Sequence, residues 1–326
     1  GTGGATSGER IVRGRKLCSI SVDLDETPNY FQIHDLPPPD PTSSGAHAVY
    51  DAAVPRLAHF AEAKNFPLTL FAIGQDLARP ENARSLRALC DRGHAVENHS
   101  FSHRYDLTRL PPKAIEREIE DGALAIEKAT GRKPSGFRAP GYAISDAVLD
   151  ALETVGARFD SSVFPCPPYY SAKALVMGAM RLAGRRSHAV LDSPRVLTAP
   201  ARPYRPGRAW HRRGNRPLIE LPIQVTPILR LPVIGTSVGL AGPTLARLLA
   251  KMCGRERFVN LELHGMDVLQ RSDGDGLERL APRQPELRTS LDRRLRALEA
   301  FVETLRAAGF AFVSMSEAAE ELRRGL

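Results

Sequence analysis

The chain has 326 residues, of which 42% are hydrophobic and 25% charged, and its formal net charge is +8. These fractions are typical of a globular protein and exclude a wholly disordered chain, a collagen and a coiled-coil rod. No run approaches the ~18 uninterrupted apolar residues that span a bilayer, and residues 1–16 lack the apolar core of a signal peptide. The chain begins with Gly rather than Met, so its cellular compartment cannot be assigned from the N-terminus. A cytoplasmic or peripheral-membrane location is favoured.

Strand and helix patterns alternate along most of the chain. We expect strands at 18–25, 67–73, 94–97, 136–138, 158–160, 218–221, 258–264 and 310–315, and helices at about 46–64, 81–92, 112–130, after Ser145, at 172–182, at 287–308 and at the C-terminus. Residues 26–44 read as a loop, and Pro55 should kink the helix around it or reset its start. The helix at 112–130 should turn four apolar residues inward: Ile115, Ile119, Leu124 and Ile126.

This alternation predicts parallel βαβ units, and therefore an α/β fold with an open sheet or a barrel. The alternation of strand and helix patterns is interrupted at about 164–217, a segment that contains eight prolines and an apolar helical stretch. We therefore expect a flexible segment at 1–16 and a single barrel-like α/β domain at 17–326 that carries this insertion. Four widely spaced cysteines with no C-x-x-C pair indicate reduced thiols.

The positive charge is concentrated at 181–216, where ten arginines accompany a single acid, Asp192. Nucleic-acid binding is disfavoured because this patch does not lie on a recognisable nucleic-acid-binding motif such as a helix-turn-helix, an RRM or a zinc finger. Two interpretations of the insertion remain open. It is either a solvated lid on the barrel rim, or an interfacial element whose apolar helix faces acyl chains and whose arginines face phosphates.

Polar residues gather where the predicted strands end, which is where α/β barrels build active sites. Asp23 and Asp25 end the first strand, and His264 ends a late one. His99 and His103 follow the third strand, and Arg138 ends the fourth. Taken singly, each also fits a plain role, such as a surface Asp pair, exposed histidines, or a His or Arg that caps a strand.

Asp23 and Asp25 are two residues apart, so on an extended strand their carboxylates share a face and repel. A divalent metal on one carboxylate, with the other acting as a base, would relieve that repulsion. His99 and His103 are four apart, and a helical turn would point both imidazoles one way, as Zn²⁺ or a similar ion requires.

The remaining strand-end residues suggest the other parts of a hydrolytic site. The pKa range of histidine makes His264 a plausible general acid. Arg138 could orient a carboxylate. A backbone N–H in the turn after Pro140 could hold an oxyanion.

Four ordered motifs then resemble a known family: Ser21-Val-Asp-Leu-Asp25, His99-Ser-Phe-Ser-His103, Phe137-Arg-Ala-Pro140 and Leu261-Glu-Leu-His264. They are similar to motifs one, two, three and five of the NodB-type polysaccharide deacetylases, carbohydrate esterase family 4, in the variant whose first motif reads D-x-D. The resemblance implies a distorted (β/α)₇ barrel and metal-dependent hydrolysis of an acyl group on a sugar.

By position, the resemblance implies that Asp23 is the general base and that Arg138 tethers it. His264 would protonate the departing amine. The metal would be bound by three ligands, namely Asp25, His99 and His103. One divalent ion is implied, with Zn²⁺ favoured over Co²⁺ or Ni²⁺.

Two further positions follow from the same resemblance. Gly141 stands where the third motif often has Tyr, with Tyr142 one place later, and only a backbone donor is needed there for the oxyanion or substrate. Asp160 is the candidate for the fourth motif.

The leading interpretation is an enzyme that removes an N-acetyl or related N-acyl group from an amino sugar, in a glycan or in a lipid-linked or anionic sugar. One alternative is a hydrolase of cyclic amides or imides with the same fold. Another is a non-catalytic glycan-binding barrel, which has no need for the acid pair, the His pair and His264 together. Peripheral membrane contact is compatible with the sequence, and no protein partner can be read from it.

Overall fold

The computed structural model describes residues 14–182, 184, 190–191 and 193–326. Most of the predicted flexible segment 1–16, and part of the insertion, therefore lie outside the described residues. The strands are β1 (Lys16–Asp23), β2 (Leu68–Ala72), β3 (Ala95–Asn98), β4 (Gly136–Phe137), β5 (Phe159–Asp160), β6 (Ile219–Glu220), β7 (Phe258–His264) and β8 (Phe310–Phe312). The α-helices are α1 (Thr27–Ile33), α2 (Val54–Ala63), α3 (Pro80–Asp91), α4 (Pro112–Thr130), α5 (Asp146–Thr154), α6 (Pro167–Leu182), α7 (Gly235–Cys253), α8 (Leu291–Ala307) and α9 (Met315–Arg323).

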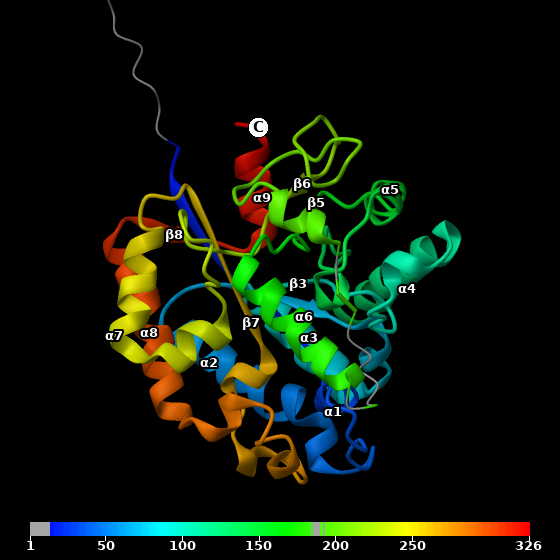
Figure 1. Ribbon diagram of the computed structural model, residues 1–326, viewed down its shortest axis with the longest axis vertical. Coiled ribbons are helices and arrows are strands. Elements are labelled where there is room, and N and C mark those ends of the chain that lie inside the picture. Colours follow the sequence, from blue (N-terminus) through cyan, green and yellow to red (C-terminus); the bar gives the residue numbers. More distant parts are fainter. Residues whose placement is uncertain (1–13, 183, 185–189, 192) are drawn as a thin grey trace, which may run out of the picture.

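The strands form one parallel sheet in the order β6-β5-β4-β3-β2-β1-β7, and β8 pairs with the start of β1. Helices lie around the outside of the curled sheet (Figure 1). Among the described residues no ladder joins β6 to β7, so the barrel is open between these two strands. The predicted α/β class and distorted barrel are confirmed.

Packing joins the two ends of the described chain. Leu17 of β1 packs in a buried cluster with Phe258 of β7 and with Met315 and Leu322 of α9. A larger apolar core lies between the sheet and the helices that include α2 and α8. Because the last strand and helix complete contacts that β1 needs, the first and last elements fold as parts of the same layer.

Several sequence expectations about helices are corrected by the structure. Residues 27–33 form α1 where a loop was expected, because the Glu26 side chain accepts from the backbone N–H of Thr27 and Pro28 occupies the first turn. No helix was expected at α7, whose sequence contains a left-handed Gly242 followed by Pro243. Helix α2 begins at Val54 with Pro55 in its first turn, so this proline resets the helix start.

The inward face of α4 was predicted correctly at three of four positions. Ile115, Ile119 and Ile126 are buried, but Leu124 is 56% exposed, so its assignment to the core was wrong. All four cysteines are buried and free, as expected. None of the described helices is both long and apolar enough to cross a membrane.

Part of the insertion packs firmly on the barrel. Arg216 lies 2.7 Å from Asp150 and 3.0 Å from Glu153 of α5, and Arg202 lies 2.8 Å from Glu256. These arginines are therefore engaged in ion pairs with the body of the protein. That 17–326 is a single domain stays a prediction.

Candidate active site

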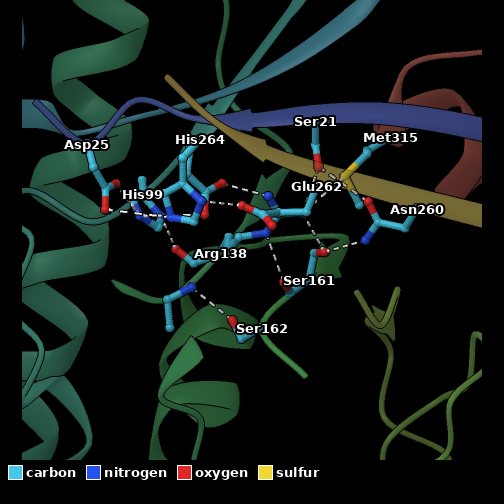
Figure 2. Close-up of polar contacts among 12 residues, drawn as sticks. Ser21, Asp25, His99, Arg138, Ser161, Ser162, Asn260, Glu262, His264 and Met315 are labelled. Atoms are coloured by element: carbon cyan, nitrogen blue, oxygen red, sulfur yellow. Dashed lines mark hydrogen bonds and ion pairs between the residues drawn. The ribbon is translucent and has the colours of Figure 1, made fainter. Parts of the chain in front are cut away.

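The register of β1 and β7 brings the polar strand ends together. Asp23 is paired with His264 across this parallel ladder, and Ser21 is paired with Glu262 two residues earlier. Because residues two apart share a face, these four side chains lie on the same side of the sheet. Figure 2 shows His264 and Glu262 beside Arg138, with Asp25 and His99 next to them.

Asp25, His99 and His103 form a compact buried group just beyond β1 and β3. One Asp25 oxygen lies 3.2 Å from His99 Nε2, and the other lies 3.2 Å from His103 Nε2. One ligand atom from each residue falls within 4.8 Å of the other two. The structure therefore brings together the three residues that the sequence singled out as metal ligands.

The two imidazoles are positioned by a loop, so the expected helical turn is wrong. Ser100 and His103 both have left-handed backbone angles, φ 66° and 55°, which fold the segment sharply. The Ser100 hydroxyl accepts from the His103 backbone N–H at 3.1 Å, and the imidazole rings of His99 and His103 lie 5.0 Å apart. His99 Nδ1 lies 2.8 Å from the carbonyl oxygen of Arg138, which leaves Nε2 facing Asp25.

The donor set of this group fits a divalent cation. Asp25 Oδ1 and both ring nitrogens of His103 are buried with no hydrogen-bond partner among the described residues. Two imidazoles and a carboxylate are a common protein ligand set for zinc with an open coordination position. Burial acts to raise the pKa of Asp25, but the neighbouring imidazoles of His103 and His99 outweigh it and hold that pKa well below its usual value.

Arg138 is wholly buried and holds Asp23 from inside the barrel. Its Nη1 donates to Asp23 Oδ1 at 2.6 Å, and its Nη2 donates to the hydroxyls of Ser21 and Ser161 at 2.9 Å. Its guanidinium also lies 4.2 Å from the ring centre of Phe71. Each of the three guanidinium nitrogens has a hydrogen-bond partner, so this buried charge pair fixes the position of the carboxylate.

A second group that could hold a cation lies next to the first and consists of Asp23, Glu262 and His264. Here the Arg138 cation already contacts Asp23 at 2.6 Å, and Glu262 already contacts His264 Nδ1 at 2.7 Å. A divalent cation would be repelled by the neighbouring guanidinium. The group of Asp25 and the two histidines is thus the better metal site.

Glu262 is a site residue that the sequence analysis missed. Its Oε1 lies 2.7 Å from His264 Nδ1, while His264 Nε2 points toward Asp25 at 3.9 Å. Burial acts to lower the pKa of His264, but the charge and hydrogen bond of Glu262 outweigh it and raise that pKa well above its usual value. The same two-residue spacing that linked Asp23 with Asp25 could have found Glu262 beside His264.

The turn after β4 lies beside this cluster. Gly141 has φ 62°, a left-handed conformation in which an added Cβ would also meet the Tyr105 ring at 2.9 Å. Tyr142 is also left-handed, with φ 62°. Its backbone N–H already donates to the carbonyl of Ala139 at 3.0 Å, so of the two predicted oxyanion donors Gly141 is the better placed.

Asp160 contributes indirectly to the same turn. Its carboxylate accepts from the Ser162 hydroxyl at 2.7 Å, and that hydroxyl accepts from the backbone N–H of Ala139 at 2.8 Å. Asp160 is fully buried, and burial raises its pKa. It therefore supports the segment that follows β4 and carries Arg138, and among the described residues it has no hydrogen bond or ion pair with the Asp25 group.

A cavity of about 390 Å³ opens above these residues. Four of the predicted site residues line it: Asp25, His264, Gly141 and Tyr142. Helices α1 and α6 form part of its walls, and Tyr105 and Met177 also line a second cavity of about 520 Å³ beside His103. The candidate metal ligand Asp25 and the candidate acid His264 thus face the same space.

Comparisons with known proteins agree with this architecture. Residues 45–159 match the family profile described as polysaccharide deacetylase. The peptidoglycan deacetylase of Helicobacter pylori is 26% identical over 157 residues, which are 47% of this chain and 52% of that protein. The peptidoglycan deacetylase-like protein FGM2 of Gibberella zeae is 35% identical over 77 residues, 24% of this chain and 22% of that protein. The first alignment thus spans about half the length of the relative.

A solved structure is similar over nearly the whole chain. The putative polysaccharide deacetylase from Mycobacterium smegmatis superposes with a TM-score of 0.59 at 18% identity, covering 96% of this chain and 92% of that one. This likeness establishes the fold. Residues 45–159 are in addition similar to the polysaccharide deacetylase profile, which agrees with the resemblance of the four motifs.

Proposed function

We propose that this protein is a carbohydrate N-deacetylase that depends on a divalent metal. The observation that carries the proposal is that the Asp25–His99–His103 group lies next to an arginine-held carboxylate, Asp23, and to His264, and that Asp25 and His264 line the same cavity. The family match of residues 45–159 supports the same reaction class. A cation held by Asp25, His99 and His103 would act as a Lewis acid on the acyl carbonyl and on water.

The roles of the other residues follow from their contacts. Asp23, fixed by Arg138, has one oxygen 4.0 Å from His99 Nε2 and accepts the proton of the attacking water. His264 is held at Nδ1 by Glu262, so its Nε2 faces the cavity and donates a proton to the departing amine. The backbone N–H of Gly141 stabilises the oxyanion of the tetrahedral intermediate.

The substrate in this proposal is an N-acetylated or N-acylated amino sugar, in a glycan or in a lipid-linked or anionic form. An anionic group is supported by the second cavity, which is lined by Arg104, Arg109 and Arg181 next to His103. Because Arg104 already bonds Asp106 at 2.8 Å, Arg109 and Arg181 are the candidates for binding that anion. Peripheral membrane contact through the insertion stays part of the proposal.

Acetate release tests this function. The purified protein should release acetate from N-acetylglucosamine oligomers, a chelator should stop the reaction, and added Zn²⁺, Co²⁺ or Ni²⁺ should restore it. Opening of a cyclic imide without acetate release would favour the amidohydrolase alternative. Glycan binding without hydrolysis, in a metal-loaded sample, would favour the binding-module alternative.

A further inference from the structure

Helix α6 carries apolar side chains that the protein itself does not bury. None of its 16 residues is buried, and Leu175, Val176 and Leu182 are 75%, 58% and 92% exposed. A helix on a globular protein normally buries an apolar stripe against the core. Of these three residues Val176 lines the site cavity, so its exposed apolar surface is accessible to a ligand there.

The first turns of α6 are nevertheless anchored beside the candidate site. The Tyr169 ring packs on those of Phe164, at 4.9 Å, and Tyr142, at 5.9 Å. Lys173 Nζ donates to the carbonyl of Gly141 at 3.2 Å. The helix is therefore held in place at its N-terminal end, next to the turn that carries Gly141.

The apolar face of α6 is a wall of the site cavity. Ala172, Val176 and Met180 recur every four residues, so they lie on one face of the helix, and all three line the cavity together with Met177. Figure 1 shows α6 crossing in front of the sheet toward α1. Asp25 and His264 line the same cavity.

Other parts of the cavity carry polar atoms that lack partners. Tyr30 Oη on α1 and Glu286 Oε2 after β7 are buried with no hydrogen-bond partner among the described residues, and both residues line the cavity. An unsatisfied buried polar group is costly, so a ligand that pairs with both would be stabilised. A tyrosine hydroxyl and a carboxylate oxygen together suit the hydroxyl groups of a sugar.

We propose that the cavity binds an amphiphilic amino sugar, with its hydroxyls on Tyr30 and Glu286 and an alkyl chain against the face formed by Val176, Met177 and Met180. This inference rests on the proposed deacetylase function and names its substrate class. A volume of about 390 Å³ is at the small end for ligand sites and suits one sugar ring with a short chain.

The test compares matched sugars below their micelle concentrations. Acetate release is measured from the methyl and octyl β-glycosides of N-acetylglucosamine, and total amine release from methyl N-octanoylglucosaminide. The octyl or the octanoyl compound should exceed the methyl acetyl compound in kcat/KM by about tenfold or more. Comparison of the octyl glycoside with the octanoyl compound tells whether the alkyl chain that the cavity binds is attached at the glycosidic oxygen or at the amide.

Variants on the two faces of α6 supply the control. Val176→Ser with Met180→Ser should bring the ratio between the alkyl and methyl substrates close to one. Leu175→Ser lies on the same helix but does not line the cavity, and should leave the ratio unchanged. Equal kcat/KM for all three sugars in the wild type, or a preference that survives in the double variant, would overturn the inference.

Binding of octyl β-glucoside, which has no amide, separates this inference from the proposed function. Calorimetry should show binding to the wild type and weaker binding to the double variant, even if no acetate were ever released. Acetate release without octyl glucoside binding would overturn the inference and leave the deacetylase function standing. A double variant that loses binding to phosphatidylcholine vesicles but keeps its alkyl preference would instead make α6 a surface anchor.

Discussion

The buried polar residues beneath the cavity, here called its floor, differ from the α6 wall in how their side chains are held. On the floor, Asp23, His99 and Arg138 are almost fully buried, and each contacts at least one other site residue. On α6, Val176 is 58% exposed and Leu175 is 75% exposed. The floor is thus fixed before any ligand arrives, whereas the wall offers apolar surface without tight packing of its own.

This difference separates chemistry from selection of substrate. Reacting groups need fixed positions, since small displacements reduce the rate steeply. An alkyl chain needs only apolar surface, and flexible methionines such as Met177 and Met180 adapt to it. Substitutions on the floor should therefore remove activity, while those on α6 should alter preference among substrates.

The largest effect should come from removing the two imidazoles on the floor. A His99→Ala, His103→Ala double variant loses two of the three proposed ligands, so it should bind no divalent ion where the wild type binds about one per chain. Elemental analysis after dialysis measures this directly, and acetate release should fall to background. Full metal content in the double variant would place the ion elsewhere.

Replacement of Asp23 should reduce activity without removing metal. Asp23→Asn keeps the shape of the side chain but removes the proton acceptor, so kcat should fall by roughly 10² to 10⁴. Asp25→Asn should instead weaken metal binding, because Asp25 and not Asp23 lies within 3.2 Å of both imidazoles. Metal content and kcat are measured on both variants, and the reverse pattern would exchange the two roles.

The sequence predicted the floor far better than the wall. Asp25, His99 and His103 could be proposed as neighbours because strand ends in a parallel α/β fold meet at one edge. Glu262 was missed although the alternation in β7 places it beside His264. The loop geometry at Ser100 was beyond reach, because a left-handed serine leaves no pattern in the sequence.

Features that depend on tertiary packing were predicted poorly. Helix α7 escaped prediction because Gly242 and Pro243 are signals that normally end a helix. Leu124 was assigned to the core from its helical spacing, yet α4 leaves it in solvent. The apolar stretch in α6 was recognised, but only the structure shows that it lines the same cavity as Asp25.

The two regions should also differ in their contribution to stability. Arg138→Met leaves the carboxylate of Asp23 buried and unpaired, so the free energy of unfolding should fall by about 3–5 kcal/mol. Adding Asp23→Asn should recover part of that loss, because no unpaired charge remains. Leu175→Ser on α6 should change stability by less than about 0.5 kcal/mol. Urea unfolding of the four proteins tests this, and comparable losses for Arg138→Met and Leu175→Ser would contradict the comparison.

The smallest effect should appear behind the floor, at the buried carboxyl pair of Glu220 and Asp160. Burial and the charge of Asp160 raise the pKa of Glu220 well above its usual value. Folded protein therefore retains a proton that the unfolded chain releases. The resulting stability is fully present below the ordinary glutamate pKa and is lost as pH rises toward the folded pKa.

Glu220→Gln removes this titration while keeping the oxygen that accepts from the Val163 backbone N–H at 3.1 Å. The free energy of unfolding of the variant, minus that of the wild type, should therefore be larger at pH 8 than at pH 5, because only the wild type loses stability as pH rises. Urea unfolding at both pH values measures that difference, and the exposed Glu278→Gln is the matched control. If the stability of the Glu220→Gln variant relative to the wild type did not change with pH, the Glu220 carboxyl would already be ionised in the folded protein. Arg138, whose charge acts to lower the pKa of Glu220, would then offset the charge of the Glu220–Asp160 pair in place of a proton.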